Sequence, residues 1–258
     1  MKMVRTVAFA LTLPLLIGHL VGGIASSDTK VGSDVNVRTV VSVKVADAEA
    51  QKLLPPGWQV SPVPSGPSQG ANLTFVFIDE LLNQAPDAKP RSNTIRRLAM
   101  VVPAKNGTSG AAGPNVVRVL TTNPQELPGP YKTSAPVSLR LEQSIKATDM
   151  ESATVSERWE ITDRSGGSII LALEYARGVP ARSKSEAKIY GGPDPAFFRI
   201  YGVDQGADLL RSGPAGIDRV KKLSLRVTTA DLKKAFDGSE QIVSIMALPW
   251  YLREVSLP

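Results

Sequence analysis

The sequence predicts a mainly β protein, of the β-rich α+β class, in which a largely antiparallel sheet curls into a barrel or a sandwich. Two observations carry this prediction. Alternating segments rich in β-branched residues recur at short intervals, and Gly, Pro, Ser or Asn residues separate them. The chain has 258 residues, 42% of them hydrophobic, and no long linker divides it, so one large domain is expected.

The first clear strand covers residues 38–45, which alternate and are rich in valine. A short helix is expected directly after it at 46–54, with Asp47 in its first turn and the Pro55-Pro56-Gly57 run ending it. Further strands are expected at 71–78, 95–102, 115–121, 138–145, 154–161, 168–175, 187–190, 197–201, 222–227 and 242–247. Two more short helices are expected near 207–210 and 229–236.

The residue inventory restricts the chemistry. The chain has no cysteine, and its one histidine, His19, lies within an N-terminal apolar run. If that run is removed, the protein has neither imidazole nor thiol, which excludes serine–histidine and cysteine–histidine nucleophiles and Cys/His metal sites. A lysine amine is therefore the first nucleophile to consider in an enzyme. We expect no cofactor and no metal; the carboxylate pair Asp79-Glu80 lacks a third ligand nearby.

The N-terminus has the three parts of an export signal. Lys2 and Arg5 precede an apolar run, and Gly23-Ile24-Ala25 offers small residues for cleavage. A retained membrane anchor is the alternative, but the uninterrupted run is shorter than the roughly 20 residues of a spanning helix. We expect residues 1–25 to be a signal peptide, 26–36 a flexible mature N-terminus and 37–258 a single domain, in the periplasm or secreted. Cleavage lowers the formal charge from +6 to +4, which does not favour nucleic acid.

Three segments in order resemble the acetoacetate decarboxylase family. They are residues 40–57, with the strand, the short helix and Leu54-Pro55-Pro56-Gly57; residues 98–103, ending at Pro103; and residues 126–136, from Glu126 to Pro136. The resemblance covers roughly residues 37–175. It implies a cone-like antiparallel β-barrel and a buried lysine that forms a Schiff base with a β-keto acid while carbon dioxide leaves.

The resemblance also implies candidate site residues. Lys132 is the candidate for the reactive amine and Glu126 matches a family glutamate, so these two are the catalytic candidates. Matching the two family prolines to Pro130 and Pro136 places Tyr131 on the reactive lysine's position and Lys132 one residue later. Such an amine attacks a ketone only when neutral, so its pKa must be lowered by burial or by a nearby cation.

Three arginines are candidates for binding the ligand. Arg97, preceded by Arg96, occupies the place of a family glutamate ahead of Pro103, and Arg38 matches a family arginine ahead of the first strand. Because adjacent strand residues point to opposite faces, one of Arg96 and Arg97 can face a pocket and clamp a ligand carboxylate. The substrate-binding candidates are therefore Arg97, Arg96, Arg38 and Tyr131.

Two classes of function fit the sequence. The first is an exported acetoacetate decarboxylase-like lyase that uses a lysine Schiff base on a small keto acid. The second is a non-catalytic β-barrel binding module for a small anionic or apolar ligand. In both, the expected partner is a small molecule, and a carboxylate is the first candidate. We expect no nucleic-acid partner and no membrane span after signal cleavage. A homo-oligomer is compatible with either.

Overall fold

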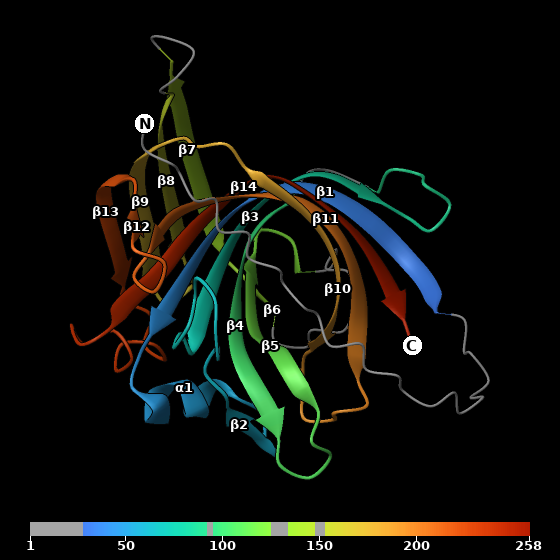
Figure 1. Cartoon of the computed structure of the whole chain (residues 1–258). Helices are drawn as coiled ribbons and strands as arrows, with labels where there is room; N and C mark the ends of the chain where they lie inside the picture. The colour runs from blue at the N-terminus through green and yellow to red at the C-terminus, as the bar shows by residue number, and fades with distance from the viewer. Residues whose placement is uncertain (1–27, 92–94, 125–133, 148–152) are drawn as a thin grey trace, which may run out of the picture.

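The computed structural model describes residues 28–91, 95–124, 134–147 and 153–258, which form fourteen strands and one α-helix (Figure 1). The helix α1 (Asp47–Leu53) follows the first strand, as predicted. The strands are β1 (Thr29–Lys44), β2 (Trp58–Val60), β3 (Leu73–Gln84), β4 (Arg96–Asn106), β5 (Ala112–Thr121), β6 (Ser134–Pro136), β7 (Ser138–Lys146), β8 (Thr154–Thr162), β9 (Ser168–Ala176), β10 (Ala181–Tyr190), β11 (Phe198–Ser212), β12 (Ile217–Asp218), β13 (Val220–Val227) and β14 (Gln241–Leu257).

Ten of the strands form one strongly curled sheet. Its order is β2-β4-β3-β1-β14-β11-β10-β5-β6, with β12 paired to β11, and β5 also pairs with β4. Most pairs are antiparallel; β6 and β10 run parallel to β5. The curl almost closes, because β10 meets β5 at the single bridge between Tyr190 and Asn115. The predicted mainly β class and curled sheet are confirmed, although one bridge pair does not make a continuous barrel wall.

The other four strands form a smaller antiparallel sheet in the order β13-β9-β8-β7. Figure 1 shows this sheet standing beside one end of the curled sheet. Its buried side chains join one core with the outward-facing residues of β1, β3 and β4. Phe77 of β3 and Trp159 of β8 meet in this core, with ring centroids 5.6 Å apart. The two sheets are therefore held together by hydrophobic packing, in a chain without cysteine.

Strand alternation separates the two sides of the curled sheet. On β3 the side chains of Leu73, Phe75 and Phe77 enter the core against the second sheet, whereas Thr74, Val76 and Ile78 point into the curl. The same division holds on β4, where Leu98, Met100 and Val102 lie in the core. Both faces of these strands are buried, and the inner face lines a cavity.

The structure corrects three expectations. Residues 29–36 are not a flexible N-terminus, because they belong to β1 and pair with both β14 and β3. Residues 207–210 are part of strand β11, and residues 230–235 form turns rather than a helix. None of the helical structure in the described part of the chain is long and apolar enough to cross a membrane.

Candidate functional site

A cavity of about 680 Å³ lies inside the curl. Seven strands of the curled sheet contribute to its wall: β1, β3, β4, β5, β10, β11 and β14. The segment between β2 and β3 adds Ser61, Val63 and Pro64. The lining residues on the strands are Arg38, Thr74, Val76, Ile78, Arg97, Ala99, Val101, Pro103, Ala104, Ala112, Gly113, Pro114, Val116, Val119, Ile189, Tyr201, Tyr251 and Arg253. Cavities of this size hold ligands of ordinary small-molecule dimensions.

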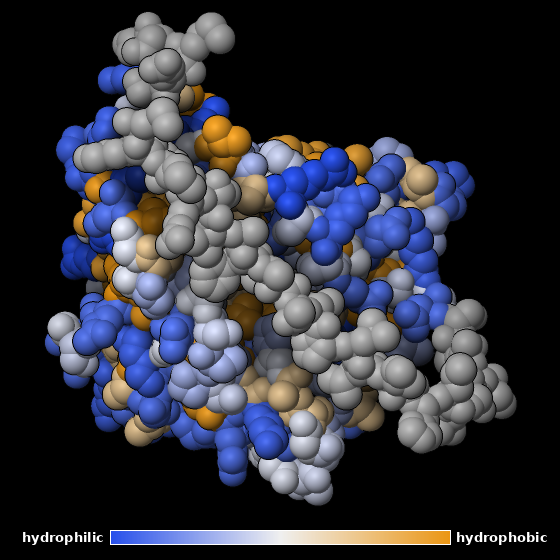
Figure 2. Space-filling model, viewed as in Figure 1, coloured by the Kyte–Doolittle hydropathy of each residue, from blue (hydrophilic) through white to orange (hydrophobic). Residues whose placement is uncertain are grey.

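The outer surface visible in Figure 2 has a different character. Figure 2 shows hydrophilic residues over much of the visible face, with hydrophobic residues in a few separate places. The cavity wall is instead mostly apolar, and its charged members are Arg38, Arg97 and Arg253. The charged groups of the wall are thus all cations among the described residues.

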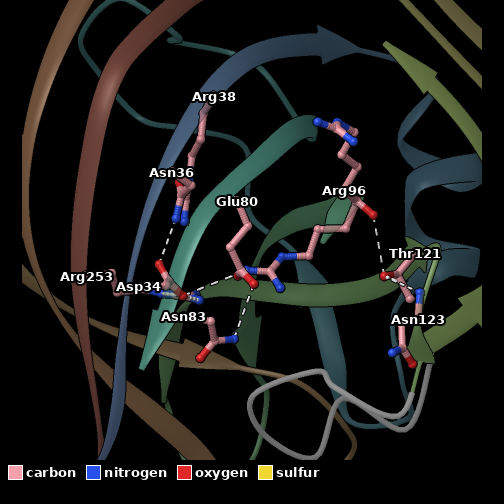
Figure 3. Close-up of polar contacts among 10 residues, drawn as sticks. Asp34, Asn36, Arg38, Glu80, Asn83, Arg96, Thr121, Asn123 and Arg253 are labelled. Carbon is pink, nitrogen blue, oxygen red and sulfur yellow. Dashed lines mark hydrogen bonds and ion pairs between the residues drawn. The ribbon is translucent and has the colours of Figure 1, made fainter. Parts of the chain in front are cut away.

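Two carboxylates behind the cavity wall hold these arginines. Arg97 donates to Glu80, and Arg253 donates through both Nε and Nη2 to Oδ2 of Asp34. Nη2 of Arg97 also lies 3.8 Å from Oδ2 of Asp34, so the Asp34 carboxylate interacts with two guanidinium groups. All four side chains are almost completely buried. Figure 3 shows Asp34 and Arg253 facing each other between neighbouring strands.

Amides and aromatic rings complete the cluster. Asn36 donates to Asp34 at 2.7 Å and accepts a 2.6 Å hydrogen bond from Nε of Arg38 (Figure 3). Asn83 donates to Glu80 at 3.2 Å. The Arg38 guanidinium lies over the Tyr251 ring, 3.3 Å from its centroid, and Arg253 lies 4.4 Å from that of Tyr201. These contacts fix the planes of both guanidinium groups.

The cluster is not neutral. Within the described residues it contains three guanidinium groups, on Arg38, Arg97 and Arg253, and two carboxylates, on Asp34 and Glu80, which leaves an excess of one positive charge. Nη2 of Arg38 and Nη1 of Arg97 are buried and make no hydrogen bond to any described residue. Buried donors without a partner are costly, so an anion in the cavity that accepts from them would be stabilised.

The titration of the cluster follows from burial and charge. Burial alone would raise the pKa of Asp34, but Arg253, Arg97 and Arg38 outweigh it and hold that pKa below its usual value. Burial lowers the pKa of Arg38 to about 10, helped by the two neighbouring arginines and opposed by Tyr251 and Asp34. For Arg253, burial is outweighed mainly by Asp34, which raises its pKa. Arg38 and Arg253 are therefore cations at neutral pH.

Of the six predicted site residues, two line the cavity, one lies elsewhere and three lie outside the described residues. Arg97 and Arg38 line the cavity, and Arg97 contacts its partner Glu80 beside it. Arg96 does not: its Nε lies 2.9 Å from Asp79 on the outer face of the sheet, so it is not a cavity residue. Lys132, Glu126 and Tyr131 lie outside the described residues. The described cavity wall contains no lysine.

Half of the cluster is not indicated by any local hydrophobic pattern of the sequence. Asp34 lies in the stretch expected to be flexible, Arg253 lies beyond the last expected strand, and neither was singled out. Glu80 appeared only as part of a carboxylate pair, whereas in the structure Glu80 and Asp79 each pair with an arginine. The available signal was the alternation Asp34, Asn36, Arg38, which places three polar groups on one strand face.

Comparisons with known proteins agree on the architecture. No protein-family profile and no curated protein matches the sequence. Among solved structures, an acetoacetate decarboxylase-like enzyme from Sphingomonas wittichii aligns with a TM-score of 0.54 and 11% identity, over 95% of this chain and 99% of that one. The chain has the acetoacetate decarboxylase-like fold.

Two more structures with this fold are similar. Acetoacetate decarboxylase from Legionella pneumophila aligns with a TM-score of 0.50 and 11% identity, over 94% of this chain and 91% of that one. The enduracididine biosynthesis enzyme MppR, solved with the condensation product of pyruvate and imidazole 4-carboxaldehyde, aligns with a TM-score of 0.51 and 10% identity, over 88% of this chain and 87% of that one. The acetoacetate decarboxylase-like fold therefore extends well beyond residues 37–175, where the sequence resemblance was found.

Proposed function

We propose that this protein binds small carboxylates inside its curled sheet, with Arg38 and Arg97 as the groups that contact the carboxylate. The observation that carries the proposal is the buried excess of one positive charge, together with the two guanidinium nitrogens that lack partners at the cavity wall. A carboxylate supplies one negative charge and two acceptor oxygens, which is what this arrangement lacks.

The guanidinium groups of the cluster are held in place before a ligand binds. Asn36 and Tyr251 hold the Arg38 guanidinium, and Glu80 holds that of Arg97, so neither has to be ordered when a ligand enters. An anion loses hydration when it enters such a cavity, and preformed donors offset that loss. Because burial disfavours the charge on Arg38, an anion next to it would raise the pKa of that group again.

Titration calorimetry with acetate and acetoacetate tests this proposal. We expect saturable binding to one site per chain, weakened at least tenfold in Arg97→Met. The double variant Arg97→Met/Glu80→Gln removes the partner charge as well, so it separates loss of the anion site from misfolding around an unpaired Glu80. Unchanged affinity in both variants would contradict the proposal.

The second candidate function is a Schiff-base lyase with Lys132 as the nucleophile. The fold favours it, because the S. wittichii and L. pneumophila structures are described as an acetoacetate decarboxylase-like enzyme and an acetoacetate decarboxylase. In this reaction the amine adds to the ketone carbon and water leaves to give an imine. The protonated imine then takes up the electron pair of the breaking carbon–carbon bond as carbon dioxide departs.

Borohydride trapping separates the two candidates. If the lyase hypothesis is right, acetoacetate and borohydride add a stable adduct to the peptide containing Lys132, and Lys132→Ala abolishes it. Lys105, which is exposed near the end of β4, provides the control: Lys105→Ala leaves the adduct intact. Carboxylate binding without any adduct between about pH 6 and 9 would support the binding module alone. Adducts on many lysines would show ordinary surface reactivity.

Export is a separate proposal. The basic residues, the apolar run and Gly23-Ile24-Ala25 support cleavage before Ser26 and a periplasmic or secreted location. Mass spectrometry of exported material should find a mature N-terminus within a few residues of Ser26. An intact Met1 in the membrane fraction would favour a retained anchor instead.

A further inference from the structure

The cavity has two chemically different ends. The three arginines belong to one cluster, in which Arg97 and Arg253 both lie within 4 Å of Asp34 and Arg38 is joined to it through Asn36. The rest of the described wall carries no charged side chain. A ligand that fills the cavity therefore meets cations at one end and apolar groups over the remaining length.

The apolar part can be followed along three neighbouring strands. From Arg97, the cavity-facing residues of β4 continue through Ala99 and Val101 to Pro103. Each lies opposite further apolar lining residues: Ala99 lies between Val76 and Val119, Val101 is paired with Val116, and Pro103 is paired with Pro114. At about 3.3 Å per residue, the six steps from Arg97 to Pro103 span roughly 20 Å of strand.

The far end is lined by apolar groups as well. The backbone N–H of Ser61 donates to the carbonyl of Pro103 at 2.9 Å, which brings Val63 and Pro64 to the wall. Among the described lining residues at that end, the only polar side chains are those of Thr74 and Ser61, and both are uncharged. A four-carbon keto acid held by the arginines would leave most of the 680 Å³ to water against apolar walls.

We propose that the ligand is a carboxylate with an unbranched or lightly branched apolar tail of about eight to twelve carbons, which lies along Ala99 and Val101 with its tail toward Pro103. This inference rests on the proposed carboxylate site and adds the class of ligand. An extended chain advances about 1.2 Å per bond, so a ten-carbon acid spans roughly 11 Å and fits between the arginines and the Pro103 end. Burial of the tail supplies affinity that the carboxylate alone does not.

The first test is a chain-length series measured by titration calorimetry at concentrations below micelle formation. The probes are acetate, hexanoate, octanoate, decanoate, dodecanoate and tetradecanoate. We expect affinity to rise up to about fourfold for each added methylene, as full burial of each group predicts, and to stop rising near twelve carbons. Equal affinity for acetate and decanoate, with both lost in Arg97→Met, would overturn the inference while the proposed carboxylate site survives.

A second test blocks the middle of the cavity. Ala99→Phe places a ring between the arginines and the far end, so decanoate binding should fall at least tenfold while acetate binding stays the same. Ala181→Phe, on an exposed position of β10, is the matched control and should bind both acids as the parent does. If Ala99→Phe does not fold by circular dichroism, Ala99→Leu tests the same contact. Undiminished decanoate binding in the folded variant would contradict the proposed path.

Decanol separates the two proposals, because it has the tail without the charge. We expect decanol to bind at least tenfold more weakly than decanoate in the parent and equally weakly in Arg97→Met. If decanol binds as well as decanoate and Arg97→Met affects neither, the carboxylate site is wrong and the ligand class with it.

Discussion

Arg96 and Arg97 are neighbours on β4, but each pairs with a carboxylate on a different face of the sheet. Arg96 contacts Asp79 outside the curl, and Arg97 contacts Glu80 inside it. Asp79 and Glu80 are themselves neighbours on β3. The two adjacent ion pairs thus have the same chemistry and different surroundings, which provides an internal control for the role of the inner pair.

Removal of the inner arginine should weaken carboxylate binding, and removal of the outer one should not. Arg97→Met takes away a desolvated donor, so we expect a loss of about 2 kcal/mol or more in binding free energy. Arg96→Met takes away a partly exposed surface ion pair, whose contribution to stability is at most about 1 kcal/mol. Calorimetry with acetate measures both variants. Equal effects of the two substitutions on affinity would contradict the assignment of Arg97 to the site.

The Asp34 carboxylate offsets part of the positive charge of the arginine cluster. Its removal should therefore lower the free energy of unfolding, and a bound anion should restore part of that loss. Asp34→Asn leaves Arg253 without its carboxylate and raises the charge excess, which should lower the free energy of unfolding by about 3–5 kcal/mol. Acetate should then raise the melting temperature of Asp34→Asn more than that of the parent.

Asp79→Asn is the control for that prediction, because Asp79 pairs with an arginine outside the cavity. It should cost about 1 kcal/mol or less and should not change the response to acetate. An equal stabilisation by acetate in Asp34→Asn, Asp79→Asn and the parent would show that the cluster does not hold an anion.

The sequence predicted most strands because their buried faces are apolar. Strand β3 shows this well: Leu73, Phe75 and Phe77 follow the two-residue period of a strand. The first half of β1 does not, since its buried positions are Gly32, Asp34, Asn36 and Arg38. The buried face of a strand that carries a charged site has no hydrophobic period, so the local pattern does not predict a strand there.

The same reason limits what the sequence could say about the site. Arg38 and Arg97 could be singled out by local position, but Arg253 and Asp34 are 219 residues apart in the chain. Their contact depends on β1 and β14 pairing side by side, a long-range register that no local pattern specifies. The expected helix at 207–210 failed similarly, because β11 continues through it between β10 and β14.

The contact between the two sheets can be tested at Phe77. This side chain is fully buried and packs on Trp159 of the second sheet. Phe77→Ala should lower the free energy of unfolding by about 3–5 kcal/mol, because it leaves a cavity between the sheets. Leu81→Ala, on the same strand but 52% exposed, should change it by about 0.5 kcal/mol or less. Urea denaturation measures both, and similar losses would show that the sheets are not held at this point.

Glu157 of β8 gives a prediction about pH. It is buried between the sheets, where the Thr39 hydroxyl donates to it at 2.6 Å. Burial raises its pKa from 4.5 to about 7, because the hydrogen bond from Thr39 offsets only part of the desolvation. Between these two values the folded protein holds a proton that the unfolded chain has lost.

Stability should therefore fall as the pH rises from about 4.5 to 7 and level off above it, by up to about 3 kcal/mol for this group. Glu157→Gln keeps a neutral side chain of the same shape, so it should match the parent near pH 4.5 and exceed its stability at pH 8. Glu160→Gln, on the same strand beside Arg158, serves as control and should show no such gain at pH 8. Urea denaturation at the two pH values decides the matter: a Glu157→Gln protein less stable than the parent at pH 8 would mean that Glu157 is ionised and satisfied in the fold.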